Sequence, residues 1–133
     1  MMGFFNGIML GTYPKKEKLK SKKHIEQLFS EGSSISVFPL RVVYLKTTFE
    51  DGVPIKAGVS VSKKIHKKAV ARNRIKRLLR EAYRLNKPKI NNSETQYALM
   101  ILYLGKEMPS FETINSRMQR LFEKFTESLN HNL

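Results

Sequence analysis

The sequence predicts an α+β fold, a two-layer sandwich in which a single sheet of about four strands packs against three helices. Two observations predict it. β-branched and aromatic runs alternate along the chain with amphipathic stretches of helical periodicity. The 133 residues are also enough for one hydrophobic core, and they contain no internal repeat. The expected order is helix, three strands, helix, strand, helix.

Residues 1–14 are expected to form a flexible N-terminal extension before a single domain over residues 15–133. The start of the chain is mildly apolar but interrupted by glycines, and it lacks the features of a secretory signal. No apolar run approaches the roughly 20 residues that span a bilayer. Met9 is an alternative initiator, which leaves open whether residues 1–8 are native.

The first helix is expected after a lysine-rich approach. Ser21 can cap its N-terminus, and Gly32 is well placed to end it. Between them, Ile25, Leu28 and Phe29 lie on one side of the helix. This apolar side predicts a helix that packs on the sheet.

Three strands are expected next, over residues 34–37, 40–48 and 55–62. Pro39 marks a break or a sheet edge. In the second strand the two predicted faces are Leu40, Val42 and Tyr44 on one side and Arg41, Val43 and Leu45 on the other. In the third strand small residues occupy alternate positions, which suggests close approach by another backbone or by a ligand.

The helix expected over residues 69–86 has two contrasting faces. Its apolar stripe is Ala71, Ile75, Leu78, Leu79, Ala82 and Leu85. The opposite face is Asn73, Lys76, Arg77, Arg80 and Arg84, with Arg72 and Arg74 at its flanks. From residue 63 to residue 84 there are ten basic residues and one acid, Glu81, in a chain of net charge +14. Solvated helix faces normally mix signs, so this face predicts binding to a polyanion such as nucleic acid.

Residues 96–104 form a continuous apolar run that predicts a central strand buried on both faces. A final amphipathic helix begins near Ser110, and its aromatic stripe is interpreted as core. The basic helix would then join two parallel strands. The default rule for such a crossover is a right-handed connection.

Nothing in the sequence assembles a protein-borne active site. There is no cysteine, which fits a reducing compartment and excludes thiolate metal sites. His24, His66 and His131 lie far apart, and we interpret His24 and His66 as RNA-contacting or solvated groups. The carboxylates are scattered, whereas two-metal nucleases cluster theirs. We therefore expect no metal ion and no catalytic residue in the protein.

Two stretches stand out together, Gly58-Val59-Ser60-Val61-Ser62-Lys63-Lys64 and Ala69-Val70-Ala71-Arg72-Asn73-Arg74-Ile75-Lys76-Arg77-Leu78-Leu79-Arg80-Glu81. They resemble the signature of the bacterial ribonuclease P protein component, and weaker similarity extends over about residues 15–128. The resemblance implies a cytoplasmic subunit of the ribonucleoprotein endonuclease that removes the 5′ leader from precursor tRNA. It implies that the RNA subunit catalyses hydrolysis with its own Mg²⁺ ions. It also implies a left-handed crossover, against the default rule.

The implied partners are the ribonuclease P RNA and the leader of precursor tRNA, with no membrane and no protein partner required. The RNA-binding candidates are Lys63, Lys64, Lys67, Lys68, Arg72, Asn73, Arg74, Lys76, Arg77, Arg80 and Arg84. The resemblance places a leader-binding cleft between the first helix and the sheet, and its candidates are Ile25, Phe29, Val42 and Tyr44. Many family members have phenylalanine where this chain has Ile25, and the strand register is open by one residue. The loop at residues 66–68 also departs from the pattern, which leaves the roles of Lys67 and Lys68 open.

The alternative function is a non-catalytic RNA-binding protein of the ribosomal or RNA-chaperone type. It would show no preference for precursor over mature tRNA. A major-groove DNA-binding protein is disfavoured, because recognition helices present mixed polar side chains rather than a row of cations.

Overall fold

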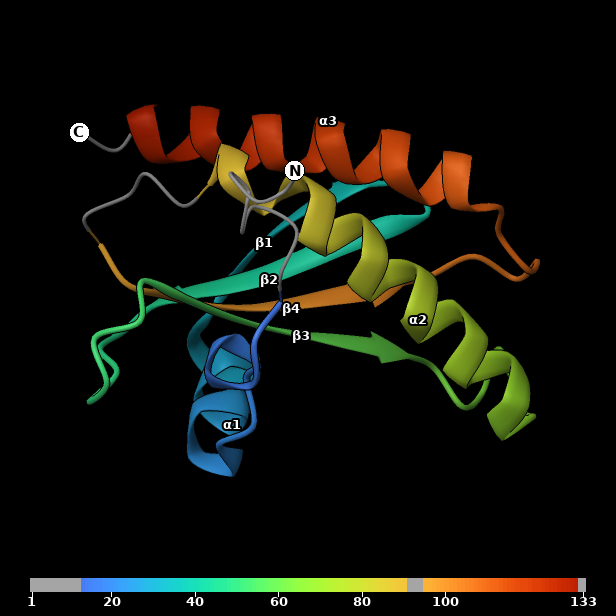
Figure 1. The fold of residues 1–133 in the computed structure, drawn as a ribbon, viewed down its shortest axis with the longest axis horizontal. Helices are drawn as coiled ribbons and strands as arrows, with labels where there is room; N and C mark the ends of the chain where they lie inside the picture. Colours follow the sequence, from blue (N-terminus) through green and yellow to red (C-terminus); the bar gives the residue numbers. More distant parts are fainter. Residues whose placement is uncertain (1–12, 91–94, 132–133) are drawn as a thin grey trace, which may run out of the picture.

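The computed structural model describes residues 13–90 and 95–131, which form a four-stranded sheet with helices on both of its faces (Figure 1). The helices are α1 (Lys22–Glu31), α2 (Ala69–Asn86) and α3 (Phe111–His131), with short 3₁₀ turns η2 (Lys15–Glu17) and η3 (Lys87–Lys89). The strands are β1 (Ser33–Val37), β2 (Leu40–Lys46), β3 (Ile55–Val61) and β4 (Tyr97–Tyr103). The predicted α+β class and element order are confirmed. The loop predicted at residues 91–93 lies outside the described residues.

The strand order in the sheet is β1-β2-β4-β3. Strand β4 pairs antiparallel with β2 and parallel with β3, so it is an interior strand, as its apolar run predicted. Because α2 connects the parallel strands β3 and β4, the basic helix is the crossover segment, as expected. The left-handed sense of this crossover stays a prediction.

The ends of α1 follow from two residues. The Ser21 hydroxyl accepts a hydrogen bond from the His24 amide at 3.3 Å, which caps the N-terminus as predicted. At the other end, a Cβ atom on Gly32 would lie 2.3 Å from the Leu28 carbonyl oxygen and 2.9 Å from that of Tyr44. No side chain fits there, so glycine is what lets α1 end directly against β2.

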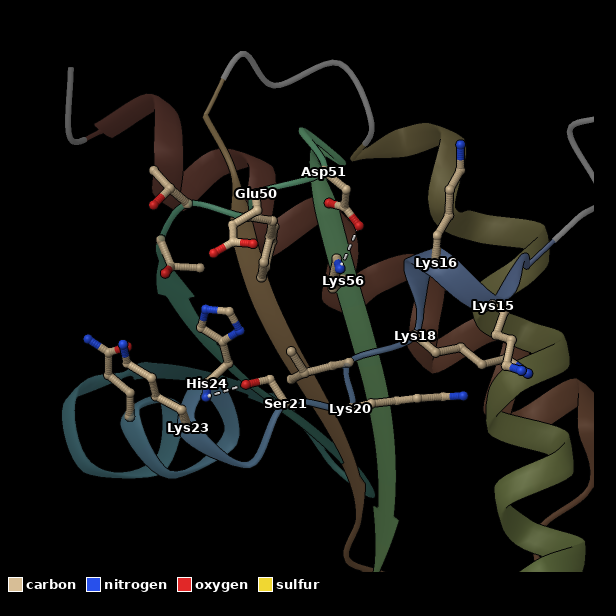
Figure 2. A pocket seen from close by; sticks show the side chains of 15 residues that line it. Lys15, Lys16, Lys18, Lys20, Ser21, Lys23, His24, Glu50, Asp51 and Lys56 are labelled. Atoms are coloured by element: carbon tan, nitrogen blue, oxygen red, sulfur yellow. Dashed lines mark hydrogen bonds and ion pairs between the residues drawn. The ribbon is translucent and has the colours of Figure 1, made fainter.

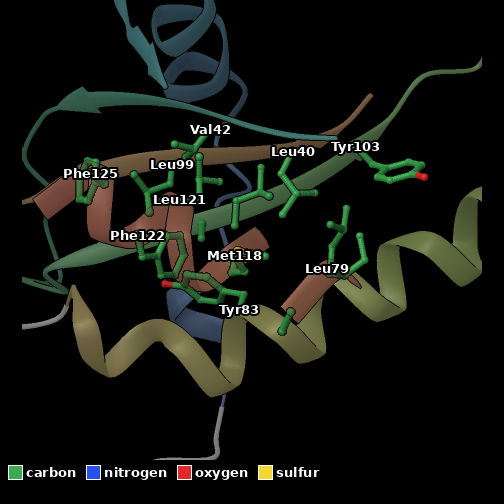
Figure 3. Close-up of a cluster of buried hydrophobic side chains, with 14 of the residues drawn as sticks. Leu40, Val42, Leu79, Tyr83, Leu99, Tyr103, Met118, Leu121, Phe122 and Phe125 are labelled. Carbon is green, nitrogen blue, oxygen red and sulfur yellow. The ribbon is translucent and has the colours of Figure 1, made fainter. Parts of the chain in front are cut away.

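The main hydrophobic core lies between one face of the sheet and the helices α2 and α3 (Figure 3). Its largest fully buried side chains include Tyr83 from α2 and Phe122 and Phe125 from α3. From the sheet, Leu40 and Val42 of β2 point into the same cluster. Burying each such side chain contributes roughly 1.5–3 kcal/mol, and this core therefore fixes α2 on the sheet.

The predicted apolar stripe of α2 is wrong at one residue, Leu85. Leu85 is 48% exposed, whereas Tyr83 and Asn86 are buried. The reason is that α2 packs against α3 as well as the sheet, which rotates its buried face toward α3. The Asn86 amide is satisfied there, because it donates to the Ala82 carbonyl and to Asn115 Oδ1, both at 2.8 Å.

A second, smaller core lies on the opposite face of the sheet, under α1. It is built from Leu19, Leu28, Phe49, Ala98 and Met100, with Ile25, Val43, Leu45 and Leu102 at its margin. Figure 1 shows α1 on this side and α2 and α3 on the other. The sheet is therefore covered on both faces, with α1 as an additional small layer beside the predicted two.

Residues 13–20, which we call the strap, pack along the edge of β3. The Leu19 amide donates to the Ala57 carbonyl at 2.9 Å, and Tyr13 donates its hydroxyl to the same carbonyl. The Tyr13 ring also lies 5.0 Å from the Tyr83 ring. Tyr13, which the sequence placed in the N-terminal extension, is half-buried and contacts α2 and β3. Residues 1–12 lie outside the described part of the chain.

Tyr13 also predicts a pH dependence of stability. Burial raises the pKa of Tyr13 to about 12 from its usual 10.0, partly opposed by the charge of Arg80. The folded state therefore favours the neutral phenol, and this contribution is complete below pH 10 and lost between pH 10 and 12. We expect Tyr13→Phe to cost about 1 kcal/mol at neutral pH and to flatten the alkaline decline in the free energy of unfolding. Urea titrations across this pH range measure both effects, and parallel wild-type and variant curves would contradict the assignment.

Candidate nucleic-acid interface

The outward face of α2 presents cations to solvent. Asn73, Arg74, Arg77 and Arg80 are exposed, and Lys76 and Arg84 are half-buried at its edges. Among the described residues, the one ion pair made by these cations joins Arg84 to Glu81. That contact lowers the pKa of the Glu81 carboxyl and raises the pKa of the Arg84 guanidinium, so both groups stay charged. The predicted cationic face is thus confirmed as a surface, with Arg84 partly neutralised.

The loop that leads into α2 is held by Arg72. Arg72 Nη1 donates to the carbonyl oxygens of His66 and Lys67, both at 2.8 Å. The Ser62 hydroxyl accepts from the Lys64 amide at 3.1 Å, which orders the start of the same loop. Arg72 therefore shapes the loop as well as adding charge, a role that the helical wheel could not indicate.

His66 is buried, which corrects its interpretation as an RNA-contacting or solvated group. It is 8% exposed, and its Nε2 lies 2.8 Å from the Gly105 carbonyl oxygen. Its ring also lies 5.8 Å from the ring of Tyr103. The physical reason is that the turn before α2 folds back on the end of β4, and the imidazole joins the two segments.

The lysines on either side of His66 lie at the surface. Lys63, Lys64, Lys67 and Lys68 are all exposed. With His66 and Arg72 anchoring the loop, these four amines extend the cationic face of α2 beyond its N-terminus. We call the basic side chains of α2 and of the loop before it, together with Asn73, the α2 surface.

The four leader-cleft candidates do not lie together. On α1, Phe29 is 52% exposed and Ile25 is half-buried against the small core. Val42, however, is 1% exposed in the main core on the opposite face. Tyr44 lies on that face too, with its ring 5.0 Å from Phe125.

Placing Val42 and Tyr44 beside α1 was therefore wrong. Successive strand residues point to opposite faces, so a shift of one residue in register exchanges the two faces. The β2 residues that pack toward α1 are Val43 and Leu45. The strand periodicity was predicted correctly, but the sequence did not indicate which face α1 covers.

A second basic region surrounds a groove between the strap, the N-terminal half of α1 and the segment that connects β2 with β3 (Figure 2). The groove has a volume of about 1040 Å³. Its lysines are Lys15, Lys16, Lys18, Lys20, Lys23 and Lys56. We call it the lysine groove. The lysine-rich approach to α1 was visible in the sequence, but its pairing with the distant connecting segment was not.

Carboxylates are sparse at this groove. Asp51 accepts hydrogen bonds from Lys56 Nζ at 2.8 Å and from the Val53 amide at 3.2 Å. The hydrogen bond from Lys56 is the main cause that lowers the pKa of Asp51.

Within residues 13–90 and 95–131, no three histidine, aspartate or glutamate side chains are grouped to hold a metal ion. No helix in the same part of the chain has the length and apolarity to cross a membrane.

Comparison with known proteins assigns the family. The family described as Ribonuclease P matches residues 13–126 of this chain. The chain belongs to the ribonuclease P protein family. The ribonuclease P protein component of Porphyromonas gingivalis (strain ATCC 33277) is 41% identical over 110 residues, which cover 80% of each chain. That of Dictyoglomus thermophilum is 33% identical over 117 residues, covering 86% of this chain and 92% of the relative.

Solved structures show the same fold. The ribonuclease P protein from Thermotoga maritima superposes with a TM-score of 0.66 at 25% identity, covering 81% of this chain and 96% of that one. The Staphylococcus aureus ribonuclease P protein also gives a TM-score of 0.66, at 20% identity, covering 81% and 94%. As a ribonuclease P protein component, the chain is a subunit of a ribonucleoprotein endoribonuclease that processes tRNA.

Proposed function

We propose that the α2 surface binds the ribonuclease P RNA and that the α1 side of the sheet receives the 5′ leader of precursor tRNA. The observation that carries this proposal is the long row of cations on α2 and its loop, in which Glu81 alone offers a counter-charge. Such a surface loses energy to self-repulsion unless a polyanion neutralises it. A folded RNA supplies that neutralisation.

The residue types on α2 suit an RNA backbone. The planar forks of Arg74, Arg77 and Arg80 can each bind two phosphate oxygens, whereas the neighbouring lysines act as point charges. Asn73 is exposed beside them and can both donate and accept at a base edge or a 2′-hydroxyl. The main core holds all four on one rigid helix.

The α1 side offers apolar and small side chains to a single strand. Phe29 is the exposed aromatic group of α1, and stacking one base on it contributes roughly 1–3 kcal/mol. Val43 at the margin of the small core takes the place expected for Val42. Gly58 on β3 lies against Met100 and has no side chain, which leaves room for a ligand on this face of the sheet. Ile25 contributes apolar contact rather than stacking.

We place catalysis in the RNA subunit, with Mg²⁺ bound at its active site and no metal bound by the protein. We also infer a cytoplasmic location, where both RNA partners would be met, and no requirement for a second protein.

Reconstitution with the cognate ribonuclease P RNA tests this function. The purified protein alone is expected to cleave nothing, whereas the mixture should remove the 5′ leader at a lower Mg²⁺ concentration than the RNA alone. The mixture should also bind precursor tRNA in preference to mature tRNA. Cleavage by RNA-free protein would contradict the proposal, and equal binding of both tRNAs would favour a ribosomal or chaperone-type protein.

The salt dependence of binding to the ribonuclease P RNA provides an independent measurement. If the α2 surface neutralises six to ten phosphates, affinity should fall by roughly 10³–10⁵ between 50 and 200 mM salt. Filter binding over this range gives the slope directly. A flat response would contradict a phosphate-binding role for α2.

A further inference from the structure

We propose that the lysine groove is a second RNA-binding site, which takes the phosphates of a single-stranded RNA segment. This inference rests on the proposed function, because the same complex supplies the RNA. The lysine groove is not part of the α2 surface or of the sheet face beside Phe29. The argument uses the charge, the shape and the anchoring of the groove.

The charge of the groove is strongly positive. Six lysines line it against two carboxylates, Glu50 and Asp51. Asp51 is already paired with Lys56, and Lys18 lies over the Tyr13 ring at 5.4 Å. The four remaining lysines are exposed, and the structure gives them no ion pair among the described residues; they are Lys15, Lys16, Lys20 and Lys23. Figure 2 shows these lysines lining the groove from the strap and α1, with side chains that extend in different directions.

The shape of the groove suits a short strand. Its volume of about 1040 Å³ is at the upper end for sites that hold drug-sized molecules, so it admits a few nucleotides and not a double helix. His24 is half-buried with its ring 5.2 Å from that of Phe49, which offers an imidazole face or edge to a base. The hydroxyls of Ser21, Thr47 and Thr48 line the same hollow and can bind phosphate or ribose oxygens.

Both walls of the groove are held in place before any ligand binds. Gln96 holds the connecting segment, because its side chain accepts from the Phe49 amide at 3.4 Å and donates to the Val53 carbonyl at 3.0 Å. The strap is held by the buried contact between Lys87 Nζ and Glu17 Oε1 at 2.7 Å. Binding therefore orders few additional groups, which reduces its entropic cost.

The residues that line the groove differ from the other proposed RNA contacts. The groove is lined by the strap, the first half of α1, residues 47–51 and Lys56, whereas Phe29 lies near the end of α1. None of the RNA-binding candidates on α2 or its loop is among the lining residues. Variants can therefore change the groove without changing the other two proposed sites.

The decisive experiment removes three exposed groove lysines in the reconstituted holoenzyme, as Lys16→Gln, Lys20→Gln and Lys23→Gln. The matched control removes the same charge from the outer side of α3, as Arg117→Gln, Arg120→Gln and Lys124→Gln. Loss of three single-strand phosphate contacts lowers the slope of log affinity against log salt by about 2. Wild type should then lose roughly 15-fold more affinity than the groove variant between 50 and 200 mM salt, and the control should keep the wild-type slope.

Two binding measurements identify which RNA occupies the groove. Affinity for precursor tRNA is measured with leaders shortened one nucleotide at a time, and affinity for the ribonuclease P RNA is measured without substrate. A defect confined to long leaders assigns the groove to the distal leader, and a defect without substrate assigns it to the catalytic RNA. Lys→Arg replacements at the same three positions should restore binding, because they keep the charge.

The proposal is overturned if the groove variant and the α3 control have the same affinity and slope for both RNAs. Its failure is distinguishable from failure of the proposed function, which variants of the α2 surface test separately. Binding of an acidic peptide by the wild-type groove, with unchanged RNA affinity in the variant, would overturn it in favour of a protein partner. Circular dichroism melting confirms that each variant is folded.

Discussion

Replacing Arg74 and Arg77 together by alanine is expected to weaken binding of the ribonuclease P RNA by roughly 100-fold. Both side chains are exposed on the outer face of α2, and the structure gives them no acidic partner among the described residues. Each charge-assisted hydrogen bond to phosphate contributes about 1.5 kcal/mol or more, so two lost contacts cost about 3 kcal/mol. Because neither residue packs in the core, the free energy of unfolding should change by less than about 0.5 kcal/mol.

The matched control for this pair is Arg117→Ala with Arg120→Ala, which removes the same charge from the outer side of α3. Filter binding to the cognate RNA at fixed salt should show wild-type affinity for the control. Arg74→Lys with Arg77→Lys should recover only part of the loss, since lysine keeps the charge and lacks the planar fork. If both double-alanine variants weaken binding equally, total charge rather than the α2 surface governs the complex.

Arg72→Ala is expected to behave differently from its neighbours. Its guanidinium holds the loop carbonyls of His66 and Lys67, so its removal loosens the segment that carries four lysines. The affinity loss should then be accompanied by faster hydrogen exchange at the amides of this loop, which Arg74→Ala leaves unchanged. Equal exchange rates in both variants would show that Arg72 acts through its charge alone.

Glu17→Gln is expected to destabilise the protein by about 3 kcal/mol. Its partner Lys87 has a side chain that is 6% exposed, so the substitution leaves a buried ammonium group without a compensating charge. Glu17 lies in the strap, whereas Lys87 follows the end of α2, and the contact therefore ties the lysine groove to the main core. Urea unfolding at neutral pH measures the change.

The double variant Glu17→Gln with Lys87→Met separates a lost attraction from a stranded charge. Removing both partners of a buried pair is often nearly neutral, so this variant should recover most of the lost stability. A double variant as unstable as Glu17→Gln alone would contradict that explanation. Lys22→Met with Glu26→Gln is a suitable control, because that pair is exposed and should contribute at most about 0.5 kcal/mol.

Periodicity by itself determined most of the fold. The bounds of α2 follow from the amphipathic run, which ends where Asn86 meets the turn before Pro88. The continuous apolar run over residues 96–104 determined the central strand, because burial on both faces requires apolar side chains at every position. The cationic face of α2 was equally readable, since exposed charges need no tertiary contact to be recognised.

Tertiary structure decided which of the two cores each strand residue packs into. Val42 and Val43 are chemically equivalent neighbours, and only the side on which α1 packs distinguishes a core residue from a cleft residue. His66 and Lys87 are buried polar residues whose partners, Gly105 and Glu17, are distant in sequence. Local patterns cannot show contacts of this kind.

The lysine groove illustrates the same division. Its lysines are visible in the sequence as a run of charge, but a run of charge does not specify a hollow. The hollow exists because the strap pairs with β3 while Gln96 holds the segment connecting β2 with β3 across from it. The sequence by itself determined that this protein carries a cationic helix on an α+β sheet. Only the folded chain decided which of its lysines line a groove, because segments far apart in sequence form that groove.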